Sequence, residues 1–244
     1  MLKEEREVFV NTLQMIQVVQ SLNGCNAKIY WWIHEPPAYF ELCKDIIPED
    51  FFNHIEPNVH IYAAGHFVQR YIYKEYGYDA GVLNFGVEDT AGTYNNVNDR
   101  NKKRIRFLLP CFYFDYLKGQ DILINAIISL PKEYLDRSEF FFLGYVEEDM
   151  MGLYNIIQQL EKAFGNVHYL QPVEHEELIS MMSGMDCMIA PSRQDATNAC
   201  IVEGMMLSKI CICSDMTGVS LYLKDCVDSF VFKAEDVGEL VKRI

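Results

Sequence analysis

Residues 186–218 read DCMIAPSRQDATNACIVEGMMLSKICICSDMTG, and the order of apolar and polar residues in this stretch decides the fold. Two short apolar runs, 188–190 and 210–213, each end abruptly at polar residues. Between them, over 198–207, apolar residues recur at the spacing of a buried helix. The stretch therefore predicts a strand, a turn, a helix and a second strand, which is the repeating unit of a parallel α/β sheet.

Two carboxylates, Asp195 and Glu203, bracket the turn and the first part of the helix. If the helix begins near Thr197, Asp195 precedes its N-terminus and Glu203 lies about two turns inside it. Free N–H groups at a helix N-terminus bind phosphate, whereas nearby carboxylates would hydrogen-bond sugar or ribose hydroxyls. The combination predicts a sugar-nucleotide site. The alternative is that Asp195 caps the helix and that Glu203 is a solvated helix residue.

The composition is that of a globular protein, with 244 residues of which 50% are hydrophobic. A net charge of −14 argues against nucleic acid or an anionic membrane as the main partner. The eight cysteines form no CxxC pair and no zinc-like cluster, so we expect reduced core residues in a cytoplasmic protein. The charged start and the lack of a long apolar run predict neither a signal peptide nor a membrane span.

Strand and helix patterns alternate along the whole chain. The first 86 residues carry four strand patterns, at 8–10, 28–33, 59–63 and 81–85. A polar, turn-rich stretch then predicts a linker over 87–103. Residues 104–244 carry six further strand patterns, at 105–109, 139–143, 167–170, 188–190, 210–213 and 229–232. We therefore expect two Rossmann-like units that face one another, joined by the linker.

Residues 191–215 (PSRQDATNACIVEGMMLSKICICSD) resemble the donor-binding segment of glycosyltransferase family 4, which has the GT-B fold. The family carries Pro-Ser, then Glu-x7-Glu, then a small apolar strand and a Gly-containing turn. Here Asp195 replaces the first Glu, Glu203 matches the second, and Thr217-Gly218 matches the turn near the donor sugar and diphosphate. The resemblance implies that Asp195 binds the sugar hydroxyls and that Glu203 binds the ribose.

The resemblance extends to Lys118-Gly119, which opens a helix as the family's Lys-Gly pair does. In the family an Arg and this Lys grip the donor diphosphate, but Phe112 and Tyr113 stand here where the family has Gly and Arg. A tyrosine hydroxyl cannot replace the charge of an arginine. Arg193 is a candidate for partial compensation, and a surface arginine is the alternative.

His34 lies at the carboxyl end of a strongly apolar strand, where open α/β sheets bind ligands. The resemblance implies that His34 contacts the donor sugar, and a structural hydrogen bond is the alternative. It also places the nucleotide base near Val173 and Leu178. His175 is interpreted as a cap or a surface residue. The remaining donor-binding candidates lie at the start of the helix: Thr197, Asn198, Ala199 and Cys200.

Together these residues imply a retaining glycosyltransferase that moves a sugar from a UDP- or GDP-type donor to a hydroxyl acceptor, in polysaccharide or glycan assembly. The acceptor would be a glycan or a lipid-linked sugar. No cofactor or metal is expected, because no DxD motif follows an apolar strand. One alternative is a sugar-nucleotide-binding module without turnover, and an epimerase is a third.

The family's Gly-rich loop and first strands have no counterpart before Val8. We therefore expect a fragment that lacks the first half of the N-terminal domain. In that case residues 8–10 form an exposed edge strand, open to self-association. The resemblance implies a cytoplasmic protein, with the full-length form peripheral to the inner face of the membrane.

Overall fold

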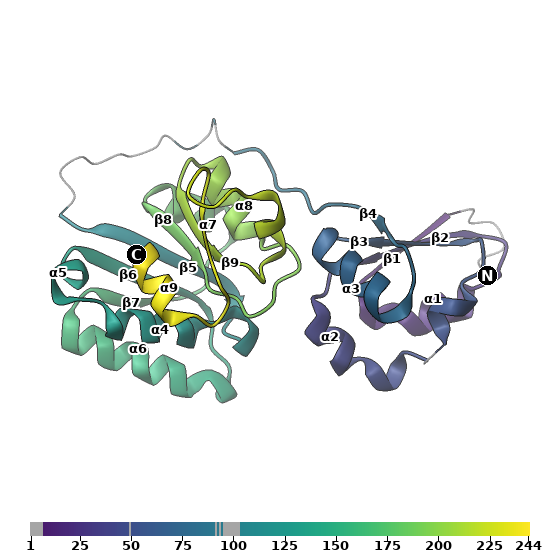
Figure 1. Ribbon diagram of the computed structural model, residues 1–244, viewed down its shortest axis with the longest axis horizontal. Coiled ribbons are helices and arrows are strands. Elements are labelled where there is room, and N and C mark those ends of the chain that lie inside the picture. The colour runs from purple at the N-terminus through teal and green to yellow at the C-terminus, as the bar shows by residue number, and fades with distance from the viewer. Residues whose placement is uncertain (1–6, 49, 91, 93, 95–102) are drawn as a thin grey trace. The chain divides into compact units, whose positions relative to one another are not determined.

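The computed structural model describes residues 7–48, 50–90, 92, 94 and 103–244, which divide into two compact units. Unit 1 comprises Met1–Gly86 and Gln194–Thr197, and unit 2 comprises Val87–Arg193 and Asn198–Ile244. Both units are parallel α/β sheets, so the predicted fold class is confirmed (Figure 1). Much of the predicted linker over 87–103 lies outside the described residues, namely 91, 93 and 95–102.

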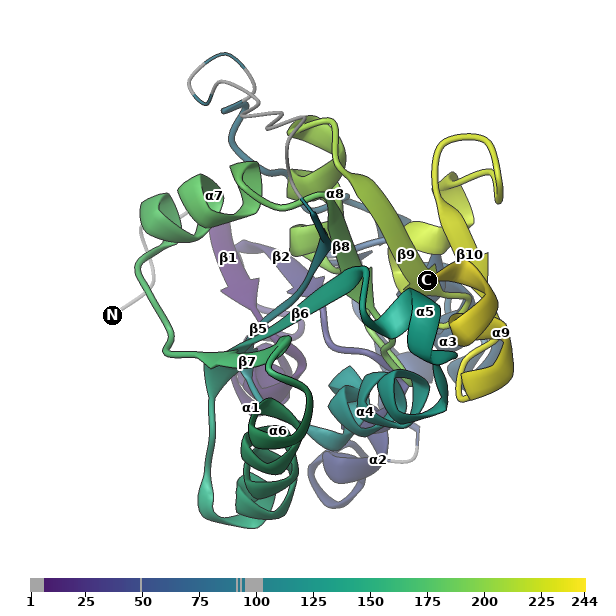
Figure 2. The ribbon, with the colours of Figure 1, turned by 90° about the vertical axis from the view of Figure 1, so that its left-hand side faces the viewer.

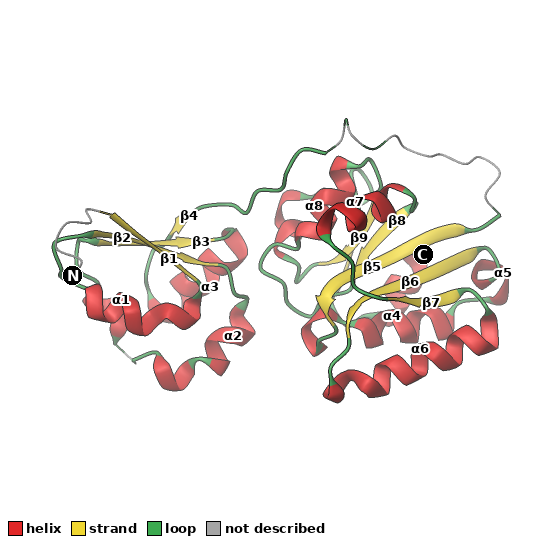
Figure 3. Ribbon diagram, turned by 180° about the vertical axis from the view of Figure 1, so that it is seen from behind, coloured by secondary structure: helices red, strands yellow, loops and turns green. Residues whose placement is uncertain are grey.

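Unit 1 contains a sheet of parallel strands in the order β1-β2-β3-β4. The strands are β1 (Glu7–Asn11), β2 (Lys28–Ile33), β3 (Val59–Ala63) and β4 (Gly81–Val82). The helices are α1 (Ile16–Leu22), α2 (Pro37–Leu42) and α3 (His66–Tyr76), with 3-10 turns η1 (Leu13–Met15), η2 (Lys44–Ile46) and η3 (Phe51–His54). The three helices lie on one face of the sheet (Figure 3).

Side chains alternate across the sheet of unit 1, as the pleat of a strand requires. One face is buried with the helices and includes Ile29, Trp31 and Ile61. The opposite face, which we call the open face, carries Phe9, Tyr30, Trp32, His60 and Tyr62. Phe9 is 59% exposed, and the rings of Tyr30 and His60 stack at 5.4 Å. Strand β1 lies at one end of the sheet, as expected for residues 8–10.

Unit 2 contains a larger parallel sheet in the order β10-β9-β8-β5-β6-β7. Its strands are β5 (Ile105–Tyr113), β6 (Ser138–Tyr145), β7 (Val167–Leu170), β8 (Cys187–Ala190), β9 (Ile210–Ser214) and β10 (Phe230–Phe232). The chain order reverses between β5 and β8, which lie side by side. In open α/β sheets, ligands bind beyond the carboxyl ends of the strands at this switch point.

Helices cover both faces of the sheet in unit 2 (Figure 2). One core contains apolar residues of α4 (Gln120–Ser129), α5 (Lys132–Leu135), α6 (Met151–Phe164) and α9 (Val237–Arg243). The other core lies under α7 (His175–Ser183) and α8 (Ala199–Met206). Strands β8 and β9 are buried on both sides, which explains why their sequences are continuous apolar runs.

Several element boundaries differ from the sequence prediction. Strand β5 continues beyond residue 109 to Tyr113, through an irregularity after Pro110. Helix α2 ends at Leu42 and is followed by the 3-10 turn η2, and the strand expected over 81–85 is only two residues long. Helix α8 begins at Ala199, later than predicted, because Asn198 caps it in a left-handed conformation. Glu203 therefore lies about one turn inside the helix, and the prediction of two turns is wrong.

Candidate functional site

The loops that follow β5 and β8 are joined at the switch point. The Arg193 amide donates to the Leu117 carbonyl oxygen at 2.7 Å. Gly119 has a φ of +73° and lies against the Pro191 backbone, whose carbonyl oxygen a Cβ at position 119 would overlap. Only glycine meets both conditions without strain. The Lys118-Gly119 turn, singled out from the sequence, is therefore built against the Pro-Ser turn that follows β8.

Arg193 is the centre of a hydrogen-bonded network. Its Nη1 and Nη2 donate to the two carboxylate oxygens of Asp121 at 2.8 and 2.6 Å, and its Nε donates to Glu235 at 2.9 Å. The guanidinium carbon lies 3.9 Å from the centre of the Tyr116 ring. The hydrogen bonds from Arg193 lower the pKa of Asp121. Because the Arg193 side chain is only 13% exposed, the alternative of a surface arginine is wrong.

The N-terminus of α8 is capped by Asn198 and not by Asp195. The Asn198 side chain accepts from the Ile201 amide at 3.1 Å, and its φ of 66° is in the left-handed region. Asparagine tolerates this conformation better than most residues. Ala199 and Cys200 form the first turn of the helix that follows. The alternative in which Asp195 is the cap is therefore wrong.

Glu203 is buried in α8, with 5% exposure. Its Oε1 lies 2.7 Å from Nε2 of His175, the first residue of α7. Because a carboxylate only accepts, the His175 nitrogen is the donor. The alternative of a solvated Glu203 is thus wrong, and His175 has a partner that the sequence did not reveal. Val173 and Leu178, on either side of His175, pack against the same core as α8.

The loop after β9 reaches the same edge of the sheet through hydroxyl groups. Ser214 Oγ donates to the Ser192 carbonyl oxygen and lies 3.1 Å from Thr217 Oγ1. Thr217 is fully buried, and Gly218 begins the 3-10 segment η6 (Gly218–Tyr222). The structure therefore brings the predicted Thr217-Gly218 turn to the Pro-Ser turn, within unit 2.

Lys118 and Tyr113 differ in their surroundings. Lys118 is half-buried at the end of the 3-10 turn η4 (Tyr116–Lys118). Burial raises the pKa of the Cys111 thiol to about 11, and a hydrogen bond from Gln120 and the positive charge of Lys118 oppose that rise. Tyr113 is 45% exposed, and its ring packs edge-on against Phe112 at 4.6 Å. Tyr113 thus belongs to a surface aromatic cluster with Phe112 and Tyr145, at the ends of β5 and β6.

Three of the predicted site residues, His34, Asp195 and Thr197, belong to unit 1. His34 follows β2, and its amide donates to the buried carboxylate of Glu35 at 3.1 Å. Asp195 is 8% exposed and accepts from the Thr197 amide at 3.3 Å. The side chain of Ala196, between them, lies in the core of unit 1. The segment Gln194–Thr197 therefore departs from the expected division, which assigned it to residues 104–244.

Further features bear on metals, membranes and redox chemistry. In the part of the chain that the structure describes, no three His, Cys, Asp or Glu residues are grouped so as to hold a metal ion. None of the described helices is both long and apolar enough to cross a membrane. All eight cysteines are free thiols, and Cys226 is exposed, so the prediction of a core position is wrong for that residue. The buried ones are Cys43, Cys111, Cys187, Cys211 and Cys213.

The motifs assembled at this edge can be compared with known families. The family model described as Glycosyl transferases group 1 matches residues 97–244. The chain belongs to this family. No curated protein sequence matches significantly.

Solved structures of GT-B glycosyltransferases resemble this family member over nearly its whole length. HepE from Anabaena, solved with UDP and glucose, has a TM-score of 0.77 at 15% identity, over 97% of this chain and 66% of that one. The UDP-forming α,α-trehalose-phosphate synthase from Burkholderia xenovorans, solved with glucose-6-phosphate, has a TM-score of 0.77 at 13% identity, over 99% and 65%. Sucrose-phosphate synthase from Thermosynechococcus elongatus has a TM-score of 0.77 at 12% identity, over 98% and 63%. The chain thus has the GT-B fold and spans about two thirds of the length of these proteins.

Proposed function

We propose that the chain is the donor-binding part of a retaining glycosyltransferase that moves a sugar from a nucleoside diphosphate to a hydroxyl acceptor. The observation that carries this proposal is the buried carboxylate of Glu203 beside the switch point of unit 2. A buried, hydrogen-bonded carboxylate is costly unless it serves a ligand or the fold. The family match and the UDP-containing neighbour support a sugar nucleotide as that ligand.

In this proposal Glu203 binds the ribose hydroxyls, and Val173 and Leu178 hold the base. Lys118 and the first turn of α8, from Asn198 to Cys200, stabilise the negative charge that grows on the diphosphate as the sugar leaves. Thr217 and Gly218 lie at the same carboxyl edge of the unit 2 sheet, where they would line the site of the donor sugar and diphosphate. Asp195 and Thr197, with His34, bind the sugar itself. Because Lys118 and the helix amides would carry the charge, we propose that the reaction is metal-independent, which turnover with and without EDTA would test.

A second candidate is a sugar-nucleotide-binding module without turnover. Two observations favour it. Tyr113 occupies the position at which the family has an arginine, and its ring lies in a surface aromatic cluster with Phe112 and Tyr145. Arg193, the other candidate for the diphosphate, is held by Asp121 and Glu235. Detection of released nucleoside diphosphate in the presence of sugar acceptors, with the configuration of the product by NMR, separates the two candidates.

Finer features of the proposal concern the donor, the acceptor and the assembly. We propose a UDP- or GDP-type donor and a glycan or lipid-linked acceptor in polysaccharide assembly. We also propose a cytoplasmic location, with the full-length protein peripheral to the inner face of the membrane. Self-association would use the edge strand β1, whose Phe9 is 59% exposed. Sedimentation of the wild-type chain and of Phe9→Lys would test that last point.

The donor site is tested by calorimetric titration with UDP, GDP and their sugar conjugates, on the wild type and on Glu203→Gln. Loss of charged hydrogen bonds to the ribose is expected to weaken binding by about 10- to 100-fold. Glu139→Gln is a matched control, because Glu139 also pairs with a histidine, at 3.4 Å, but lies near the amino end of β6. Equal affinities of the wild type and Glu203→Gln would refute the assignment of the ribose to Glu203.

A further inference from the structure

The His175–Glu203 pair has a feature that the donor-site proposal does not explain. Glu203 is nearly buried, with a side chain 7% exposed, whereas the His175 side chain is 59% exposed. A hydrogen bond from an exposed histidine to a buried carboxylate fixes the direction of that carboxylate. Among the described residues no second hydrogen bond to this carboxylate is found, so Oε2 is left for another donor.

We propose that His175 is a positioning residue of the donor site, which orients Glu203 so that Oε2 receives the ribose hydroxyls of a nucleoside diphosphate. This inference rests on the proposed function of Glu203. His175 Nε2 holds Oε1 at 2.7 Å, which is the length of a strong, charge-assisted hydrogen bond. With Oε1 held by His175 and the side chain only 7% exposed, the carboxylate is fixed in one orientation. Its ligand hydroxyls then find Oε2 already in place.

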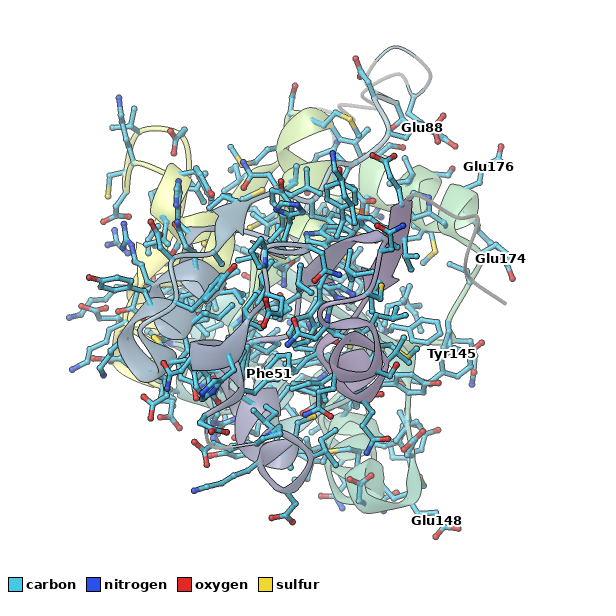
Figure 4. The ribbon with its side chains drawn as sticks, turned by 90° about the vertical axis from the view of Figure 1, so that its right-hand side faces the viewer. Phe51, Glu88, Tyr145, Glu148, Glu174 and Glu176 are labelled. Carbon is cyan, nitrogen blue, oxygen red and sulfur yellow. The ribbon has the colours of Figure 1, made fainter. Side chains whose placement is uncertain are left out.

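The surroundings of His175 support a role toward Glu203 and not toward the cap of its own helix. The side chain of Glu174, which precedes α7, makes no capping hydrogen bond, and neither does His175. Glu174 and Glu176, on either side of His175, are exposed, and their side chains extend away from the ribbon (Figure 4). His175 therefore differs from its two neighbours in being anchored to another helix, α8, across 28 residues of sequence.

The test is calorimetric titration of the whole chain with UDP and GDP and with the 2′-deoxy form of whichever binds more tightly. His175→Ala is expected to weaken binding of the ribonucleotide about tenfold and binding of the deoxynucleotide much less, because only the former needs an oriented Oε2. His175→Gln is expected to restore most of the affinity, because its Nε2 can donate to the same oxygen. His168→Ala is the matched control, since His168 pairs with Glu139 and Glu161 near the amino end of β7.

The outcomes separate the two proposals. If the wild type binds neither nucleotide, the donor-site function fails and this inference fails with it. If the wild type binds and His175→Ala weakens both sugar forms equally, or changes neither, only the role of His175 is overturned. A thermal melt of each variant shows whether unfolding contributes. A selective, Gln-rescued loss for the ribonucleotide supports the proposal.

Discussion

Gly119→Ala tests whether the Lys118-Gly119 turn is fixed by its contact with Pro191. Gly119 has a φ of +73°, and an added Cβ would lie 3.1 Å from Ile122 Cδ1 and 2.9 Å from the Pro191 carbonyl carbon. An alanine in the left-handed region costs about 1 kcal/mol after the gain from a stiffer unfolded chain. Overpacking against backbone atoms adds about 1–3 kcal/mol. The expected loss in the free energy of unfolding is therefore about 2–4 kcal/mol.

Gly165→Ala isolates the steric part of this loss. Gly165 lies in the same unit, has a φ of +68°, and has no atom within 4 Å of the position of an added Cβ. Its substitution is expected to cost only the conformational share, about 1 kcal/mol. The midpoint of thermal unfolding should fall by about 2–4 °C for Gly165→Ala and by about 4–16 °C for Gly119→Ala.

The two tryptophans make the assay specific to a unit. Trp31 and Trp32 are the only tryptophans of the chain, and both lie in β2 of unit 1. Tryptophan fluorescence therefore follows unit 1, while far-UV circular dichroism follows both units. The Gly119→Ala shift should be seen by circular dichroism and leave the fluorescence transition in place if the units unfold separately. Equal shifts for Gly119→Ala and Gly165→Ala would show that the turn relaxes away from Pro191 and would refute the reasoning.

Three further predictions concern charge, thiols and backbone strain. Arg193 lowers the pKa of Asp121 below 3.8. Asp121→Asn should therefore destabilise unit 2 by about 1.5–3 kcal/mol at neutral pH. In denaturation curves, the difference from wild type should shrink as the pH falls below 3.8. Burial raises the pKa of Cys213 from 9.0 to about 12. The protonated thiol therefore contributes its full stabilisation below pH 9, and this stabilisation is lost as the pH rises toward 12. In alkaline unfolding, Cys213→Ala should lose less stability over this range than the wild type. Thr12, at φ 77° and ψ 150°, occupies a backbone region suited only to glycine. Thr12→Gly should therefore stabilise unit 1 by about 1 kcal/mol, as measured by unfolding followed with tryptophan fluorescence. A destabilised variant would show that the backbone at Thr12 is not strained.

The sequence was sufficient to locate the strands of both units, because most of them are short apolar runs closed by turn residues, but it did not give the ends of β4 and β5. The boundaries of α8 were less predictable. Asp195, Thr197 and Asn198 are all good capping residues, and the sequence does not say which one caps. The choice depends on the left-handed backbone of Asn198 and on Ala196, which lies in the core of unit 1.

The partners of the site residues could not be predicted because they come from distant elements. Arg193 is 72 residues from Asp121 and 42 residues from Glu235 in sequence. No local sequence pattern therefore predicts that this arginine pairs with carboxylates of the same chain. Because His175 opens a helix, its place in the sequence predicts a cap or a surface residue, and its contact with Glu203 arises only when α7 and α8 pack together. Spacing along the chain identified Glu203 as a candidate, whereas only the packing of α7 against α8 identifies His175 as its hydrogen-bond donor.

The open face of unit 1 has a consequence for the behaviour of the protein in solution. Aromatic rings on one side of a sheet attract other apolar surfaces, and at neutral pH the net charge of −14 keeps copies of the chain apart. That repulsion weakens near the isoelectric point of about 4.8 and in concentrated salt, where the Debye length falls to about 3 Å at 1 M. We therefore expect the protein to stay dispersed at low ionic strength above about pH 7, and to precipitate first in mildly acidic or high-salt buffers.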